Sequence, residues 1–345
     1  MNRFECDNAY EKDLKEFSEQ LLEKAGVYSP AAEREIMCLA DSGNLIACKL
    51  YADLIYYKKV PRKEPFREAF SLYLKSAGLC IDETGAVSCD GPSYPLAFWI
   101  VGYYLVNYKK ESLLQSCETI DGIEAMSDPD RLSTALELSA ACIHYVDAPG
   151  ALNLIGRILA EASREETVFK ALMPVIRESL NVSCDSPEKC SALSEEYFEK
   201  AAEKGYIYAA NNLAAKEADR ILSLSKEEEQ NGLLTVHLEK YIKNLKLSAD
   251  RFEPYAANRL GLFYMNGEIR NGDDKKVFRE YVDFSLAKEY FLKATKYPDA
   301  NSAWAYFNLI KYFHKDYDRN IELLNEHMDY IRMLNPKIYD LAIEL

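Results

Sequence analysis

The sequence predicts an all-α protein, a right-handed superhelical solenoid of stacked antiparallel helix pairs, and three observations lead to that expectation. Ala209, Ala256 and Ala303 stand 47 residues apart (256 − 209 and 303 − 256). The letters Tyr-Ala-Ala-Asn occur at both 208–211 and 255–258, so the repeat is visible in residue identity as well as in hydropathy. A single helix pair cannot bury its own apolar faces, and it therefore needs neighbouring copies to form a core.

The clearest copy of the repeat spans residues 255–296. Ala256, Leu260 and the glycine that follows recur at helical spacing and give a first helix one small, apolar face. An Asn-Gly pair then ends the helix with a turn. A second helix begins near Leu286 and carries alanines and a Tyr-Phe pair on its own apolar face.

Three earlier first helices carry the same signature, an alanine followed five residues later by glycine or alanine. Their leading alanines are Ala47, Ala97 and Ala151, which brings the expected number of first helices to six. A seventh pair is expected at the N-terminus, from helices at 8–25 and 30–40.

The early repeats are longer than the late ones, with steps of 50, 54 and 58 residues (97 − 47, 151 − 97 and 209 − 151). We therefore expect extra helices at 111–126 and 164–180, and a long exposed Gly/Pro/Ser-rich loop at 80–95. The whole chain is expected to form one solenoid domain with four parts: an N-terminal helix pair (1–45), longer, irregular repeats with extra helices (46–190), regular repeats (191–313) and C-terminal capping helices (314–345).

The run Ala-x3-Leu-Gly-x2-Tyr-x2-Gly at 256–267, followed by Ala-x2-Tyr-Phe-x-Lys-Ala at 287–294, resembles the Sel-one-like repeat family, which is related to the tetratricopeptide repeat. The similarity covers nearly the whole chain and is strongest over 192–313 and weakest over 105–190. The longer central spacings depart from the usual unit of that family. The resemblance implies a superhelix whose first helices line a concave groove for a protein or peptide.

Composition restricts the partners and the location. The chain has 42 Lys and Arg against 56 Asp and Glu, a net charge of −14 without any basic run, so we expect neither nucleic acid nor a membrane as partner and favour a basic peptide or protein. No signal peptide and no uncharged apolar run of 18 residues is present. The nine cysteines show no stapling pattern, so we expect nine free thiols and a cytoplasmic protein.

Chemistry-bearing motifs are missing from the sequence. The four histidines are scattered over separate repeats, and there is no HExxH, GxSxG or Gly-rich phosphate loop. The carboxylate runs fall in links and turns, where solvation explains them. We therefore expect no enzyme activity, no metal site and no cofactor.

The expected ligand-binding face follows from the repeat register. Its positions lie two residues after each repeat alanine, and one and five residues after the following glycine or alanine, on a face of the first helix that adjoins the buried stripe. The candidates are Lys49, Asp53, Tyr57, Trp99, Tyr103, Asn107, Asn153, Arg157, Asn211, Asn258 and Asn266, with Glu161 and Asp219 on the same face. Amides can bond to a peptide backbone and aromatics can hold its side chains. A solvated helix face with packing tyrosines is the alternative interpretation, and it stays open here.

Three functions from different classes are consistent with these observations. The first is a non-catalytic scaffold or adaptor that holds a protein or peptide in its groove. The second is a peptide-sensing regulator, a role that tetratricopeptide-like solenoids have in some bacterial signalling systems, although residues 1–40 hold no basic recognition helix. The third is a hydrolase, which some members of the resembled family are described to be; no pair of nucleophile and base is visible to support it.

Overall fold

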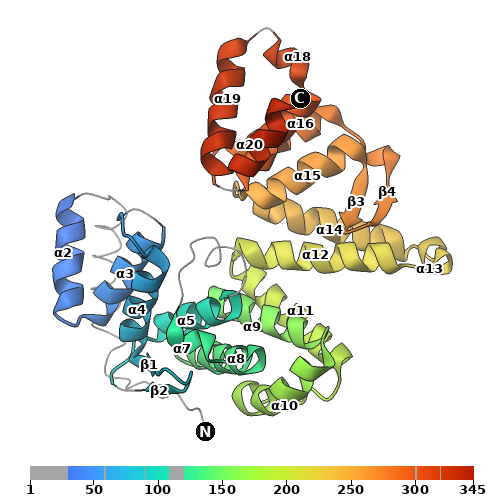
Figure 1. Ribbon diagram of the computed structural model, residues 1–345. Coiled ribbons are helices and arrows are strands. Elements are labelled where there is room, and N and C mark those ends of the chain that lie inside the picture. The colour runs from blue at the N-terminus through green and yellow to red at the C-terminus, as the bar shows by residue number, and fades with distance from the viewer. Residues whose placement is uncertain (1–29, 58–59, 90, 109–119, 300, 319) are drawn as a thin grey trace. The chain divides into compact units, whose positions relative to one another are not determined.

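The computed structural model describes residues 30–57, 60–89, 91–108, 120–299, 301–318 and 320–345. These residues are mainly α-helical, with two short antiparallel β-hairpins (Figure 1). The chain forms two compact units, residues 1–201 and 202–345. The N-terminal helix expected at 8–25 lies outside the described residues.

The first unit contains eight longer helices, one short helix and one hairpin among its described residues. Their bounds are α2 Pro30–Asp41, α3 Leu45–Tyr56, α4 Pro65–Ala77, β1 Leu79–Ile81, β2 Val87–Cys89, α5 Pro95–Asn107, α7 Asp121–Glu124, α8 Asp128–Tyr145, α9 Pro149–Ala162 and α10 Glu166–Leu180, followed by α11 Pro187–Glu203, which ends at the start of the second unit.

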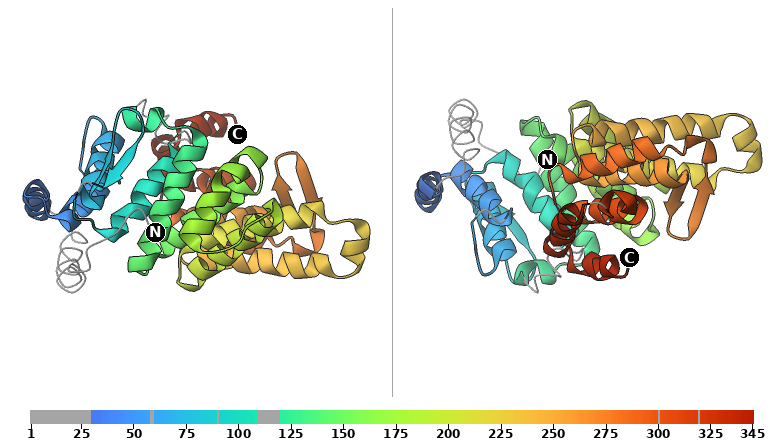
Figure 2. Two further views of the ribbon diagram at one scale, coloured as in Figure 1. Left: turned by 90° about the horizontal axis from the view of Figure 1, so that it is seen from below. Right: turned by 90° about the horizontal axis from the view of Figure 1, so that it is seen from above.

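The second unit has the same kind of organisation. Its described elements are α12 Ile207–Ser223, α13 Lys226–Gln230, α14 Leu233–Ala249, α15 Pro254–Asn266, β3 Glu268–Asn271, β4 Asp274–Val277, a 3-10 turn Arg279–Tyr281, α16 Phe284–Thr295, α17 Ser302–Tyr312, α18 His314–Tyr317, α19 Ile321–Leu334 and α20 Pro336–Ile343. In both views of Figure 2 the orange strands lie at the side of this unit, next to the yellow helix α12, which they contact.

Helices that follow one another along the chain form the main packing contacts. In the first unit α3 packs on α4 and α5 on α8; in the second, α12 packs on α14, α15 on α16 and α17 on α19. Consecutive pairs also touch, as α14 with α15 and α16 with α17 do. The helical class and the pairing of neighbouring helices agree with the expectation from the sequence.

The repeat register predicted from the alanines is confirmed. The leading alanines of the six first helices have no exposed surface: Ala47, Ala97, Ala151, Ala209, Ala256 and Ala303. A side chain larger than a methyl group has no room where two helices approach so closely, which explains the small residues at these positions.

Glycines on the first helices allow an aromatic ring of the second helix to lie directly against the backbone. A Cβ atom placed on Gly156 would lie 2.6 Å from the Phe198 ring, and one on Gly261 would lie 2.5 Å from the Phe291 ring. Both phenylalanines belong to a Tyr-Phe pair of the second helix, and both rings are almost fully buried. The glycine is therefore required by the distance between the helices, not by backbone conformation.

Two predicted connections have more structure than expected. The loop expected at 80–95 contains the β1–β2 hairpin, in which Leu79 and Val87 are buried. The turn after α15 leads into the β3–β4 hairpin, which closes over Asn271-Gly272. Each hairpin lets the chain satisfy backbone hydrogen bonds locally while it crosses between helices. The structure thus corrects two expectations: the loop expected at 80–95 contains one β-hairpin, and the turn expected after α15 leads into another.

The extra helices are borne out where the structure describes them. The helix expected at 164–180 is α10, and the last residues of 111–126 form the short α7. The final helix is α20, and it leaves the apolar side chains of Leu341 and Ile343 exposed.

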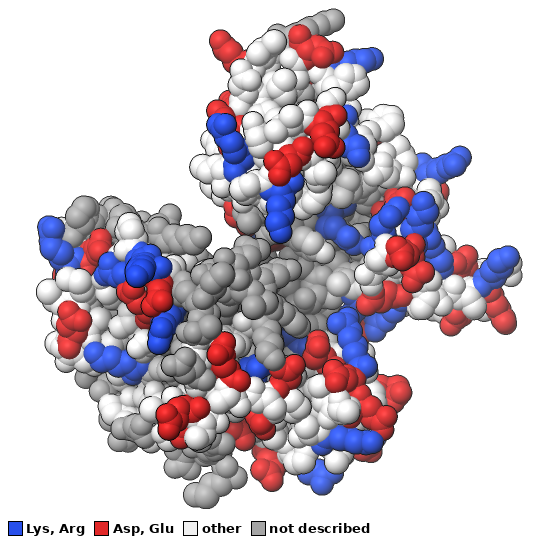
Figure 3. Space-filling model, in the orientation of Figure 1, with Lys and Arg blue, Asp and Glu red and all other residues white. Residues whose placement is uncertain are grey.

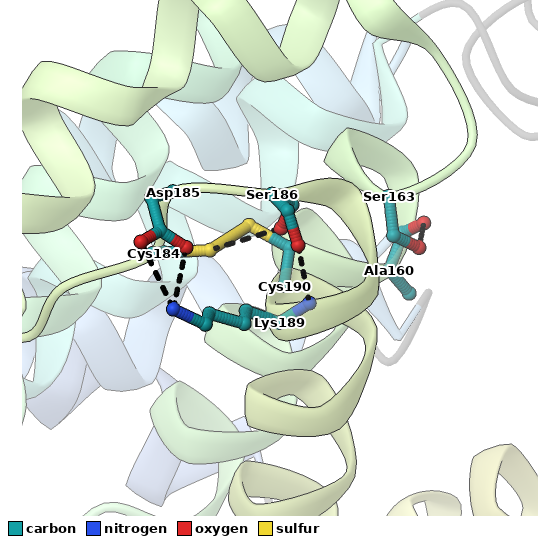
Figure 4. The surroundings of a disulfide bond; sticks show 7 residues. All are labelled: Ala160, Ser163, Cys184, Asp185, Ser186, Lys189 and Cys190. Carbon is teal, nitrogen blue, oxygen red and sulfur yellow. Dashed lines mark hydrogen bonds and ion pairs between the residues drawn. A yellow bond between two sulfur atoms is a disulfide. The ribbon is translucent and has the colours of Figure 1, made fainter.

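The expectation of nine free thiols is wrong for one pair. Cys184 and Cys190 form a disulfide, with Cα atoms 5.9 Å apart (Figure 4). Cys184 lies in the turn before α11 and Cys190 in the first turn of that helix, which brings the two side chains together although the polar loop gave no such signal. The same turn is held by Lys189, whose ammonium lies 2.7 Å from a carboxylate oxygen of Asp185.

We expect Gly261→Ala to destabilise the protein, because its methyl group would overlap the Phe291 ring. Overpacking of this kind costs about 1–3 kcal/mol, which outweighs the gain of up to about 1 kcal/mol in helix propensity. The thermal midpoint measured by circular dichroism should fall. Gly91→Ala is the control, since nothing lies within 4 Å of the added methyl. Equal midpoints for both variants would contradict the close helix crossing.

The disulfide predicts the number of reactive thiols. In denatured protein purified without oxygen, the wild type should gain two more titratable thiols on reduction than the double variant Cys184→Ser with Cys190→Ser gains, because only the wild type holds this bond. Nine thiols in the unreduced wild type would show that the bond is absent in solution.

Candidate functional site

Eight of the expected groove residues come from the first helices of the first unit, and all of them except the buried Asn153 have accessible side chains. We call these seven accessible residues the row: Lys49, Asp53 and Tyr57 from α3 and its C-terminal cap, Trp99, Tyr103 and Asn107 from α5, and Arg157 from α9. All have intermediate or exposed side chains. The row therefore consists of accessible residues on three helices that occupy equivalent places in successive repeats.

The α3 part of the row is centred on Asp53. Its carboxylate lies 2.6 Å from the Lys49 ammonium and accepts a hydrogen bond of 2.7 Å from the Tyr73 hydroxyl. Burial, and then the charge of Asp53, raise the pKa of Tyr73, so this phenol stays a hydrogen-bond donor. The same two causes raise the pKa of Tyr94, the residue that precedes α5, to about 12. The Asp53 carboxylate is thus held by Lys49 on its own helix and by Tyr73 on α4.

The α5 and α9 part of the row is one connected cluster. The rings of Trp99 and Tyr103 meet edge to face with centroids 6.5 Å apart. The Arg157 guanidinium lies 5.7 Å from the Tyr103 ring centroid and donates a hydrogen bond of 2.7 Å to Asn107 Oδ1. Asn107 in turn donates a hydrogen bond of 2.6 Å to the Tyr103 carbonyl oxygen. Gly150 of α9 leaves room for the Trp99 side chain, since a Cβ there would lie 2.9 Å from the indole ring.

A cavity of about 130 Å³ adjoins this cluster at the C-terminal ends of α5 and α9. Arg157 belongs both to the row and to the cavity wall. Leu105, Leu132 and Val168 supply apolar walls. The charged lining consists of Asp128, Arg131, Arg157, Glu161 and Glu165.

Arg131 is a buried cation in the cavity wall, and its charge is compensated locally. Its guanidinium pairs with the Asp128 carboxylate, donates a hydrogen bond of 3.1 Å to the Met126 carbonyl oxygen and lies over the Tyr108 ring. Reasoning from the sequence missed Arg131, Glu165, Tyr73 and Tyr94, because all four lie on second helices or in connections.

The structure removes Asn153 from the expected binding face. Its side chain is 6% exposed and belongs to the interior of the unit. Six consecutive residues of α9, 151–156, are buried, because α5, α8 and α10 all pack against this helix. The position two residues after the alanine faces a neighbouring helix here, so Asn153 cannot bind a peptide from solution.

In the second unit the expected amides are engaged with the protein itself. Asn211 donates a hydrogen bond of 2.9 Å to Glu253, a buried carboxylate that also accepts from the backbone nitrogens of Tyr255 and Ala256 at the start of α15. Asn258 accepts a hydrogen bond of 2.9 Å from Asn308 on α17. These amides connect successive first helices, α12 to α15 and α15 to α17.

The β3–β4 hairpin covers part of the same face of the second unit. Asn271 at its turn donates a hydrogen bond of 2.7 Å to Asp219 of α12, and Lys276 lies 2.5 Å from a carboxylate oxygen of Glu229. Asn266 is exposed at the end of α15, immediately before the hairpin. A ligand therefore meets fewer accessible expected residues on this unit than on the first.

The histidines do not form a reactive group in the described part of the chain. His144 and His314 are exposed, and His327 is buried with Nδ1 2.8 Å from the Tyr317 hydroxyl. His237 Nδ1 lies 2.6 Å from the buried Glu217 carboxylate, which also pairs with Arg220. Among the described residues, no group of three His, Cys, Asp or Glu side chains is placed to hold a metal ion.

Comparisons with known proteins do not assign the chain to a family. No protein-family model matches it, and no curated protein matches it in sequence. Within the described residues, no helix is both long and apolar enough to cross a membrane. The site must therefore be interpreted from its own residues.

The Asn258–Asn308 bond predicts a stability effect that a solvent-exposed asparagine would not have. Each single change to alanine should destabilise the second unit by about 1 kcal/mol, and a double-mutant cycle should give a coupling energy of about 0.5–1.5 kcal/mol. Urea unfolding followed by circular dichroism measures both. Asn266→Ala, at an exposed position, is the control and should change little. Additive effects of the two changes would show that the bond is not formed.

Proposed function

We propose that the protein is a non-catalytic scaffold whose row on α3, α5 and α9 binds an extended segment of a peptide or protein partner. The observation that carries the proposal is the cluster of Trp99, Tyr103, Asn107 and Arg157, half-exposed and joined by hydrogen bonds and ring contacts. Aromatic and arginine side chains that are held rigidly lose little conformational entropy on binding, which is why they dominate protein interfaces.

The row suits an extended ligand because its members come from consecutive first helices. Packed helices lie about 8–10 Å apart, so three of them span about 16–20 Å, the length of five or six residues of an extended chain at about 3.3 Å each. Trp99 and Tyr103 offer apolar ring surface, while the partly exposed Asp53 carboxylate offers an acceptor for basic atoms. Asn107 is engaged with Arg157 and with the Tyr103 carbonyl oxygen, so it holds the cluster together. Among the described residues on the face seen in Figure 3, acidic and basic side chains are interspersed. The row itself carries both signs, with Lys49 and Arg157 alongside Asp53, which favours a mixed segment over a highly charged one.

The proposal also covers the handedness of the superhelix, its repeat family, the charge of the partner and the location of the protein in the cell. It includes a right-handed superhelix of Sel-one-like repeats over the whole chain, because the register of alanines and glycines continues from α3 to α17. The net charge of −14 favours a basic partner. We also propose a cytoplasmic location. Because disulfides are rare in reducing compartments, this location requires that the Cys184–Cys190 bond is reversible in the cell.

The test uses peptides selected from a displayed random dodecapeptide library with wild-type protein as bait. The best binder is then measured by calorimetry on variants. Trp99→Ala should weaken binding by about 2 kcal/mol, the loss typical of a central aromatic anchor. Arg157→Ala should weaken binding by about 1 kcal/mol, because Tyr103 and Asn107 would lose the hydrogen bond and the ring contact that hold them in place.

Tyr297→Ala is the matched control, because this aromatic residue is 62% exposed on the second unit. It should leave the affinity unchanged. Thermal melts of all variants separate loss of binding from loss of fold. A library that yields no binder, or binders that tolerate Trp99→Ala, would refute the proposed function.

A further inference from the structure

The outward side of α14, in the second unit, carries a stripe of large apolar residues and lysines. Leu233, Val236 and Leu247 are 40–46% exposed there. Lys240 and Lys243 stand between them and are exposed as well. Because an α-helix turns by 100° per residue, the five positions fall within an arc of about 80°. We call these five residues the α14 stripe.

The core of the second unit does not use the α14 stripe. Leu238, Tyr241 and Leu245 lie on the opposite side of the helix and belong to the buried core, where α14 packs on α12 and α15. Three large apolar side chains on one exposed arc are therefore left without a role in folding. Contiguous exposed apolar surface of this kind typically marks an interaction site.

Another second helix shows that such an outward face can be fully polar in this architecture. Apart from Ala192, the exposed side chains of α11 are charged: Glu188, Lys189, Glu196, Glu199, Lys200 and Glu203. Both signs of charge are mixed along that helix, as is usual for a solvated face. The α14 stripe differs from it in both hydropathy and charge.

The charge on the α14 stripe has a single sign. Neither Lys240 nor Lys243 forms an ion pair with any residue that the structure describes. The only carboxylate of α14 is that of Glu239, which lies on the flank of the stripe and does not pair with Lys243. The stripe is thus a local positive surface on a chain whose net charge is −14. An acidic partner complements it.

The spacing of the α14 stripe fits a helix as its partner. Positions 233, 236, 240, 243 and 247 follow one another at intervals of three and four, which are the a and d positions of two heptads. Such a seam packs against one further helix. A second copy of α14 does not fit, because in either orientation the lysines in the middle of one seam would face the lysines of the other.

We propose that the α14 stripe binds an amphipathic helix of an acidic partner protein. The apolar residues of that helix pack on Leu233, Val236 and Leu247, and its Asp or Glu residues pair with Lys240 and Lys243. This surface lies on the second unit and takes a helix, whereas the row on the first unit takes an extended segment. The inference goes beyond the proposed function and does not depend on it.

The first experiment selects the partner helix without assuming its sequence. Helical peptides three heptads long, randomised at the positions that face a neighbouring helix, are displayed and selected on the wild-type protein. Peptides that also bind the double variant Val236→Ser with Leu247→Ser are removed by counter-selection. We expect the remaining peptides to combine apolar residues at heptad spacing with Asp or Glu.

The second experiment exchanges the charges and measures affinity by fluorescence anisotropy of the labelled best binder. Lys240→Glu with Lys243→Glu should weaken binding about tenfold or more, and it should bind a peptide whose selected acids are replaced by lysine. Lys275→Glu with Lys337→Glu is the matched control, because it makes the same change in net charge at exposed lysines elsewhere on the unit. Thermal melts verify that each variant is folded.

Several outcomes would overturn the acidic-helix proposal. They are a selection without binders specific for the α14 stripe, binders that lack acidic residues, and a charge exchange that does not restore binding. Vesicles of phosphatidylcholine with phosphatidylserine and sedimentation equilibrium test the other occupants. Vesicle binding lost in Lys240→Glu with Lys243→Glu would assign the stripe to a membrane surface, and a dimer lost in Val236→Ser with Leu247→Ser would assign it to a second copy.

Discussion

In two helix pairs, one in each unit, the distance between the helices depends on one contact, an aromatic ring of the second helix packed against a glycine of the first. Gly156 with Phe198 and Gly261 with Phe291 show it in both units. Any Cβ on these glycines would occupy ring atoms, so the pair can approach only when the side chain is absent. The close approach fixes how α9 and α15 are rotated, and on α5 the contact of Gly102 with the Ala135 backbone has the same effect. The rotation of a first helix decides which of its residues reach solvent.

The row in the first unit is a consequence of that rotation. With Ala97 and Gly102 buried, Trp99, Tyr103 and Asn107 stand on the opposite side of α5. The same register on α9 leaves Arg157 as the contact between the two helices, and this residue also reaches the cavity wall. Packing and the proposed peptide-binding row are therefore coupled through helix rotation, although they use different residues.

The sequence correctly predicted those features that depend on residues only a few positions apart. Buried alanines at Ala47 and Ala256 follow from 3.6-residue periodicity and from the small residues that helix crossings need, both of which are local properties. The partners of Asn211 and Asn258 lie 42 and 50 residues away, so no local pattern could reveal that these amides are occupied. The prediction that Asn153 is accessible was wrong for a related reason. Helices α5, α8 and α10 pack against α9, and periodicity alone does not reveal how many neighbours a helix has.

The enclosure of α9 also limits how recognition can change in evolution. Only Pro149, Arg157, Ala160 and Glu161 of this helix have partly exposed side chains. On α3 and α5 a surface residue can be exchanged without touching the core, so affinity and stability can drift separately there. On α9 the accessible positions are few, and two of them, Arg157 and Glu161, are charged. We therefore expect that adaptation of this repeat to a new partner would change the charge at these positions.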